Sequence, residues 1–281
     1  MLRTLLWAAG ALLLFAGAAV ADEPWQTLPN EPPMPQPRAS GQAPVNGISM
    51  YYAVFGEGPP VLMIHGGLAY AGVWTYQARD LSTDHTVIVA DSRGHGRSTR
   101  DAEPYSYHLM AEDYVALLDY LKVEKAAVVG WSDGANIGLD LAMNHPDRIS
   151  RLFSHAGNYN TAGLLPGFGD TETFTRYIAR MKDVYLRISS TPGEYEDFLT
   201  KLGVMWDSQP DWSLAQLGKI GIPVTVVLGD HDEAVKREHT ESLAAAIPHA
   251  KLVMLPGVSH FAIMQNHALY TAAIRTFLTE E

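Results

Sequence analysis

Short apolar runs recur along the chain and alternate with stretches that have helical periodicity. Six runs rich in β-branched residues predict strands at residues 48–56, 60–67, 85–92, 125–132, 223–230 and 250–257. Their apolar positions do not clearly alternate with polar ones, which is typical of parallel strands that helices cover on both faces. We therefore expect a parallel sheet inside an α/β domain.

Amphipathic helices are predicted between these runs from the recurrence of apolar positions at helical spacing. The expected helices are Val73–Ser82, Tyr107–Leu121, Asn136–Met143 and Glu238–Ala246, with a last one from about Phe261 to Leu278. The alternation of strands and helices along the chain predicts a doubly wound, mostly parallel sheet.

Residues 157–212 break this rhythm. They lack strand runs and contain helical pieces such as "TFTRYIARMKDVYLRI". We expect a helical lid inserted over the sheet. Its aromatic residues indicate an apolar pocket, although most of them should belong to the core, and the sequence does not show which ones face a substrate. The aromatic residues are Phe168, Phe174, Tyr177, Tyr185, Trp206 and Trp212.

The first 21 residues have the pattern of a secretory signal peptide. Arg3 supplies a positive charge, the run from Leu5 to Val20 is apolar, and Ala19 and Ala21 form an A-x-A cleavage site before Asp22. An uncleaved membrane anchor is the alternative, because the run nearly reaches the length that spans a bilayer. The cleavage site favours the signal peptide and predicts a periplasmic or secreted protein.

Residues 22–46 are predicted to form an extended linker, since residues 22–44 hold seven of the seventeen prolines. The α/β domain is then expected over residues 47–281. The formal net charge of −11, with no cluster of Lys or Arg, argues against nucleic acid or a membrane surface as a partner. A small-molecule substrate remains, and the oligomeric state is not indicated.

The segment "VVGWSDGANIGL" sets one serine, Ser132, directly after a predicted strand and before a predicted helix. Gly130 and Gly134 flank it, as a sharp strand-to-helix turn requires. Such a turn holds the serine hydroxyl at a helix N-terminus, where developing negative charge is favoured. The chain contains no cysteine, which excludes disulfides, thiolate nucleophiles and cysteine metal sites.

A second loop with two glycines, "MIHGGL", follows another predicted strand. The amide of Gly67 and the amide of Asp133 could form the pair of donors that holds a tetrahedral oxyanion. His65 is expected to organise the loop beneath the site. The Asp133 side chain has two interpretations that both stay open: it binds a cationic substrate or raises the pKa of the histidine, or it is an ordinary carboxylate at a helix start.

Two further strand ends supply an acid and a base. Asp230 and Asp232 follow one strand, and His260 follows the last strand run. A serine nucleophile needs a histidine base, and the histidine needs a buried carboxylate. We favour Asp232 for this role, because it lies farther from the strand, and Asp230 as a cap of the loop. A metal site in "DHD" has no matching ligand cluster elsewhere.

The order Ser132, Asp232, His260 is the chain order of one hydrolase architecture. From about residue 47 to 280 the chain resembles an α/β-hydrolase-fold serine hydrolase, with "GWSDG", "HGG", "GDHD" and "GVSHF" as the matching segments. It resembles the biphenyl-hydrolase-like, esterase and lactonase enzymes most, although Ala135 stands where many of those have a third glycine. The segment "DSRGHGRS" also resembles that superfamily, where it is mostly structural.

The resemblance implies acyl transfer to water by Ser132, Asp232 and His260, with no cofactor or metal. A carboxylic ester is the favoured substrate class. Lactone, thioester, amide and carbon–carbon bond cleavage stay open as alternatives on the same residues. A ligand-binding protein with residual hydrolysis is the alternative from another class, and an envelope scaffold tethered by the proline segment is a further one.

Overall fold

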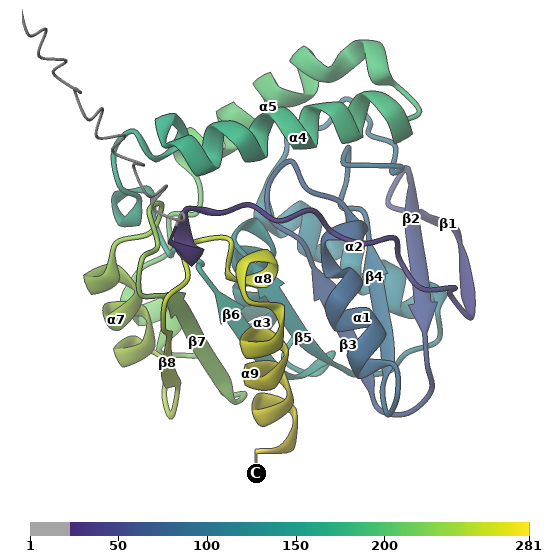
Figure 1. Ribbon diagram of the computed structural model, residues 1–281. Coiled ribbons are helices and arrows are strands. Elements are labelled where there is room, and N and C mark those ends of the chain that lie inside the picture. The colour runs from purple at the N-terminus through teal and green to yellow at the C-terminus, as the bar shows by residue number, and fades with distance from the viewer. Residues whose placement is uncertain (1–22, 281) are drawn as a thin grey trace, which may run out of the picture.

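The computed structural model describes residues 23–280, and within them an eight-stranded sheet forms the centre of the molecule (Figure 1). The strands lie in the order β1-β2-β4-β3-β5-β6-β7-β8; β1 pairs antiparallel with β2, β2 antiparallel with β4, and the remaining pairs are parallel. The mostly parallel sheet predicted from the sequence is confirmed. The strands are β1 (Ala39–Val45), β2 (Ile48–Phe55), β3 (Pro60–Ile64), β4 (Thr86–Ala90), β5 (Ala126–Trp131), β6 (Ile149–His155), β7 (Val224–Gly229) and β8 (Lys251–Leu255).

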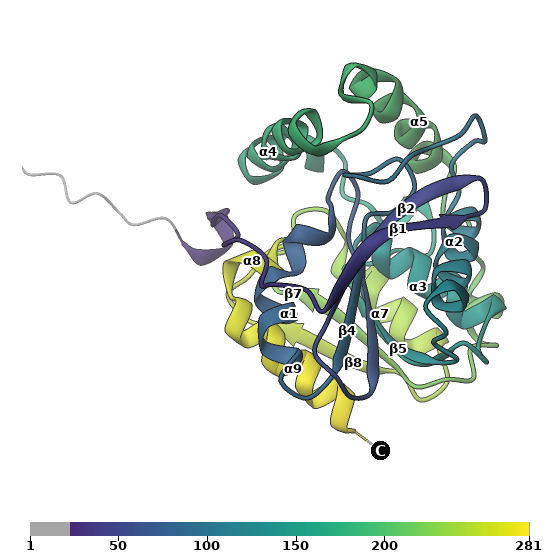
Figure 2. The ribbon, with the colours of Figure 1, turned by 90° about the vertical axis from the view of Figure 1, so that its right-hand side faces the viewer.

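Helices cover both faces of this sheet, so that the doubly wound arrangement is also confirmed. The helices α1 and α9 lie on one face, and α2, α3 and α7 lie on the other (Figure 2). The helices are α1 (Thr75–Leu81), α2 (Tyr107–Tyr120), α3 (Asp133–Asn144), α4 (Glu172–Ile188), α5 (Tyr195–Ser208), α6 (Leu214–Leu217), α7 (Arg237–Ala246), α8 (Ala262–Gln265) and α9 (His267–Thr279).

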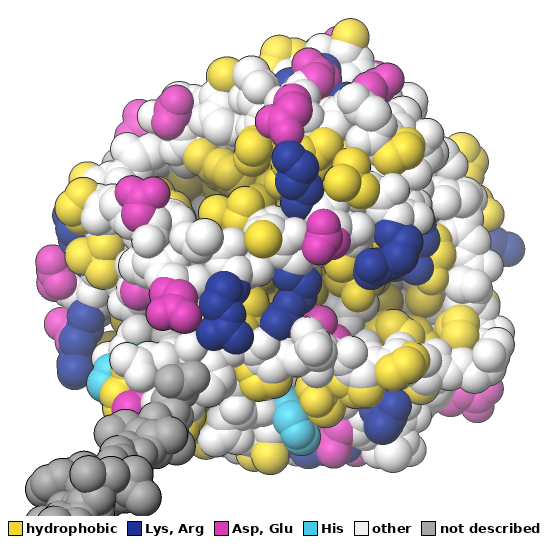
Figure 3. All heavy atoms as spheres, turned by 45° about the horizontal axis from the view of Figure 1, so that its top comes forward, with side chains coloured by type: hydrophobic (Ala, Val, Ile, Leu, Met, Phe, Trp, Pro, Cys, Tyr) yellow, Lys and Arg dark blue, Asp and Glu magenta, His cyan; other side chains and the backbone are white. Residues whose placement is uncertain are grey.

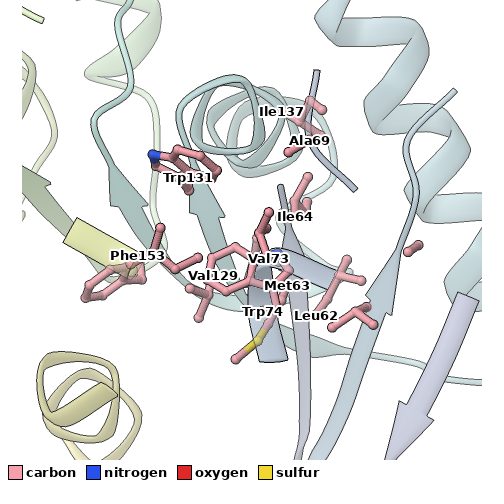
Figure 4. Close-up of a cluster of buried hydrophobic side chains, with 14 of the residues drawn as sticks. Leu62, Met63, Ile64, Ala69, Val73, Trp74, Val129, Trp131, Ile137 and Phe153 are labelled. Carbon is pink, nitrogen blue, oxygen red and sulfur yellow. The ribbon is translucent and has the colours of Figure 1, made fainter. Parts of the chain in front are cut away.

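The core lies between the sheet and its covering helices (Figure 4). Every residue of β5 and of β7 is buried, which explains why both strands are almost uninterrupted apolar runs. Side chains of β3 and β5 pack with Trp74 and with Ile137 of α3 in this core. The dense packing holds the carboxyl ends of the strands, from which the site residues project, in fixed positions.

Two strands of the sheet were not predicted from the sequence. The first, β6, contains Arg151, whose side chain interrupts the apolar run and donates to the carbonyl oxygens of Phe277 and Glu280 at the end of α9. The second, β1, contains Gly41 and Pro44, which are uncommon inside strands but are tolerated at the edge of a sheet. Tertiary position outweighed local sequence preference in both strands.

The linker prediction for residues 22–46 is wrong from Ala39 onward, because β1 belongs to the sheet. The preceding residues 23–38, here called the N-terminal arm, lie against the domain. Gln265 donates from Nε2 to the carbonyl oxygens of Trp25 and Thr27, and Arg180 of α4 donates to that of Pro29. Proline-rich backbone makes few internal hydrogen bonds, so its carbonyl groups are free to accept these bonds from side chains.

The lid predicted for residues 157–212 contains α4 and α5, which lie above the carboxyl ends of the strands (Figure 1). From this side, hydrophobic side chains show in a hollow of the surface, with acidic and basic side chains scattered around it (Figure 3). Among residues 23–280, no helix has the length and apolar character needed to cross a membrane. The predicted signal peptide lies outside the described residues.

Candidate active site

Ser132 stands at a sharp turn between β5 and α3. Its φ of 54° lies in the left-handed region, which is uncommon for a residue with a side chain and marks a strained turn. A Cβ atom at Gly130 would collide with the backbone of Gly134, and one at Gly134 would collide with the carbonyl oxygen of Ile64. The close approach of three backbone segments therefore explains both glycines around the serine.

The structure brings Ser132, His260 and Asp232 together from three separate loops. His260 Nε2 lies 3.0 Å from Ser132 Oγ, and His260 Nδ1 lies 3.0 Å from Asp232 Oδ2. The side chains of His260 and Asp232 are 5% and 1% exposed. This is the geometry in which a histidine can accept the serine proton while a buried carboxylate orients its ring.

The two aspartates of the acid loop have different partners, as the sequence analysis expected. Asp232 Oδ1 accepts hydrogen bonds from the amides of Ala234 and Val235, each at 2.8 Å. Asp230 Oδ1 instead accepts from the amide of Gly257 at 2.8 Å and has no contact with His260. Asp230 therefore ties the acid loop to the histidine loop, whereas Asp232 reaches the imidazole.

The amides of Gly67 and Asp133 are free to receive a ligand. Asp133 is the first residue of α3, where an amide has no acceptor within its own helix. Among residues 23–280, no group accepts a hydrogen bond from the Gly67 amide. The neighbouring His65 lies beneath the loop: its Nδ1 contacts the carbonyl oxygen of Gly66, its Nε2 accepts from the amide of Ser92, and burial lowers its pKa to about 4.

Two residues around His260 were missed in the sequence analysis. Glu233 accepts hydrogen bonds from the His260 amide at 3.1 Å and from the Ser259 hydroxyl at 3.3 Å. Trp131 donates from Nε1 to the His260 carbonyl oxygen at 2.8 Å. Glu233 directly follows Asp232 in the chain, and this position beside the predicted acid could have indicated that Glu233 also lies near His260.

Opposing effects set the pKa values of the acid and the base. Burial lowers the pKa of His260, but the carboxylate of Asp232 first, and then those of Glu233 and Asp133, raise it above its ordinary value. Burial raises the pKa of Asp232, but His260 and the two bonded amides bring it below its ordinary value. Each of the two groups therefore stabilises the charged form of the other.

Replacing Glu233 with glutamine should shift the pH dependence of turnover to lower pH. A histidine that acts as general base must be neutral, so with His260 in that role kcat/KM would rise as pH passes upward through its pKa. Removing one nearby negative charge lowers that pKa, and the midpoint of the rising limb follows it, while the amide oxygen of glutamine can still accept from the His260 amide. Glu241→Gln, at an exposed carboxylate paired with Arg237, serves as the control. A midpoint that stays constant or rises would contradict this prediction.

A pocket of about 120 Å³ opens beside Ser132 and His260. Four of the six lid aromatics named from the sequence line it, whereas Tyr185 and Trp212 do not. Tyr185 instead stacks on Phe198 within the lid, with ring centroids 5.0 Å apart. The aromatic residues that line the pocket are Trp131, Phe168, Phe174, Tyr177, Trp206 and Tyr107.

The fold and this arrangement of residues agree with a family comparison. The family described as alpha/beta hydrolase fold matches residues 59–214, more than half of the chain. The chain belongs to this family. The match includes the serine turn and the Gly67 loop, and it confirms the resemblance found in the sequence. The aspartate and histidine loops lie beyond the matched residues.

Several characterised proteins are similar to this alpha/beta hydrolase. A 2-hydroxymuconate semialdehyde hydrolase of a Pseudomonas species is 27% identical over 80% of this chain and 88% of its own. The crystal structure of the enol-lactonase from Burkholderia xenovorans has a TM-score of 0.67 and 26% identity, and the match covers 85% of this chain and all of that one.

A putative carbamate hydrolase of Azorhizobium caulinodans is more similar over a shorter stretch. It is 41% identical over 103 residues, which are 37% of this chain and 39% of the relative. The chain thus spans about two fifths of the length of the first curated relatives that it matches. Each of these three relatives is named as a hydrolase or a lactonase, which agrees with the family match.

Proposed function

We propose that the protein is an exported serine hydrolase that cleaves a carboxylic ester of a small to medium, largely apolar substrate. The observation that carries the proposal is the line of contacts from Ser132 Oγ through the His260 ring to Asp232, next to two free backbone amides. Nucleophile, base, orienting acid and oxyanion donors are the parts that acyl transfer requires. Export rests on the pattern of residues 1–21 alone.

The proposed reaction proceeds through an acyl-enzyme. His260 takes the proton of the Ser132 hydroxyl as the oxygen attacks the ester carbonyl carbon, and Asp232 stabilises the imidazolium. The amides of Gly67 and Asp133 donate to the oxyanion of the tetrahedral intermediate. The intermediate expels the alcohol, which receives the proton from His260. Water then attacks the acyl-serine by the same route and releases the acid.

The size of the pocket restricts the range of possible substrates more than the catalytic residues do. Its volume of about 120 Å³ and its aromatic walls suit a group of roughly the size of a benzene ring, which a cavity of about 150 Å³ accommodates. The Asp133 carboxylate already accepts from Tyr107 Oη at 2.8 Å and Trp206 Nε1 at 2.9 Å. These two bonds favour a structural role for its side chain over the binding of a cationic substrate.

Lactones form the second candidate class, because the similar enol-lactonase aligns over its whole length. A lactone is an internal ester, so the same attack opens the ring and leaves acid and alcohol in one product. Adding a six-membered lactone to the substrate series separates the two classes.

The test combines turnover with covalent labelling. We expect the purified protein to hydrolyse p-nitrophenyl acetate and butanoate faster than the octanoate, whose chain exceeds the pocket. A fluorophosphonate should add to Ser132, as located by mass spectrometry of the peptides, and a short ester should slow this labelling. A folded protein that neither turns over the esters and the lactone nor takes the label would support the ligand-binding alternative instead.

A further inference from the structure

The lid contacts both residues whose amides are proposed to bind the oxyanion. Tyr177 of α4 donates from Oη to the carbonyl oxygen of Gly67 at 2.7 Å. Trp206 of α5 donates from Nε1 to Oδ2 of Asp133 at 2.9 Å. Each of the two long lid helices thus supplies one hydrogen bond to one of the two residues.

Gly67 needs such a bond, because a glycine backbone has more conformational freedom than any other. Gly67 has no side chain whose packing could fix the orientation of its N–H group. The space that its side chain would occupy is filled instead: a Cβ atom there would lie 2.6 Å from Trp206 Cζ2 and 2.8 Å from Asp133 Oδ2. The lid therefore packs against Gly67 through Trp206 and donates a hydrogen bond to its carbonyl oxygen through Tyr177.

Asp133 is held in a similar way from two elements. Tyr107, the first residue of α2, donates to Oδ1 at 2.8 Å, and Trp206 donates to Oδ2. Both carboxylate oxygens thus have partners, and burial raises the pKa of this group. These bonds fix the first residue of α3, and with it the direction of the Asp133 amide.

We propose that Tyr177 and Trp206 are positioning residues through which the lid holds the Gly67 and Asp133 amides at the oxyanion. This inference rests on the proposed function and deepens it: the lid shapes the pocket and also sets the geometry of the transition state. A donor that is misplaced by a fraction of an ångström loses stabilisation of the developing charge, while the neutral substrate binds as before.

The test compares two tyrosines of the same helix. Tyr177→Phe removes one hydroxyl and keeps the ring that packs on Phe261 and Trp131. Tyr185→Phe makes the same change at a hydroxyl that contacts Arg100 and Thr191, away from the pocket. For p-nitrophenyl butanoate, we expect Tyr177→Phe to lower kcat about tenfold, with KM within about twofold of wild type. Tyr185→Phe should behave as wild type.

A trifluoromethyl ketone gives a readout that lid stability alone would not change. The Ser132 oxygen adds to its carbonyl carbon, the serine proton passes to His260, and the hemiketal oxygen carries the negative charge. Its inhibition constant should rise in Tyr177→Phe by the same factor by which kcat/KM falls. Trp206→Phe removes the donor to Asp133, and its inhibition constant should likewise rise by the factor by which its kcat/KM falls. We also expect Tyr177→Phe to unfold at the same temperature as the wild-type protein.

The possible outcomes separate this inference from the proposed function. An unchanged kcat, a rise in KM alone, or an equal loss in Tyr185→Phe would overturn the positioning role while leaving the serine hydrolase intact. A wild-type protein that neither hydrolyses the esters nor binds the ketone would overturn both. A parallel loss of turnover and ketone affinity, confined to Tyr177 and Trp206, supports the inference.

Discussion

Ser132→Ala is expected to lower kcat for p-nitrophenyl butanoate by a factor on the order of 10⁶, or to the uncatalysed background if that is reached first. The loss is large because alanine has no atom to form the acyl-enzyme, and neither His260 nor the free amides can replace it. Alanine needs no more space than serine at this strained turn, so we expect the variant to fold.

The control is Ser208→Ala, which removes an exposed hydroxyl at the end of α5 and should leave turnover unchanged. Thermal unfolding of both variants tests their folding. If Ser132→Ala kept more than about a hundredth of the wild-type rate, another nucleophile or a directly attacking water would be responsible.

The second large effect is expected for Asp232→Asn. Asparagine keeps the shape of the side chain, but it carries no charge to stabilise the imidazolium, and its NH₂ group favours the wrong tautomer of His260. We expect kcat to fall by about 10⁴. Because the pKa of His260 depends first on this carboxylate among the groups that raise it, the rising limb of the pH profile should also move to lower pH.

Asp230→Asn provides a matched control two residues away in the same loop. Its amide oxygen can still accept from Gly257, so turnover should stay within about threefold of wild type. A larger loss in Asp230→Asn than in Asp232→Asn would reverse the assignment of the two aspartates.

The positions that follow strand ends were the ones that could be predicted from the sequence. Ser132, Asp232 and His260 follow the carboxyl ends of β5, β7 and β8, and a parallel sheet brings such positions to one edge. Gly130 and Gly134 also pointed to this turn, because the backbone of Gly134 leaves no room for a Cβ atom at Gly130, and that of Ile64 leaves none at Gly134. Local pattern and chain order together thus predicted these contacts.

The contacts that were missed depend on how distant segments pack. Tyr177 and Gly67 are 110 residues apart, and nothing in either local sequence points to the other. Likewise, β6 was missed because Arg151 interrupts its apolar run, and the hydrogen bond from Arg151 to Phe277 in α9 is not visible in the local sequence. The contacts of the N-terminal arm were missed because its partners, Arg180 and Gln265, lie far from it in the sequence. Periodicity identifies elements, but it does not show which side chains meet after the chain folds.

The pairing of β1 with β2 has a practical consequence for expressing the protein. A shortened chain that starts at Gly47, where composition alone places the domain, would lack β1 and leave the backbone groups of β2 without partners along one side. Exposed edge strands of this kind recruit strands of other molecules. Such a truncation invites aggregation, and a soluble recombinant protein should therefore retain the residues from Ala39 onward and also the arm before them.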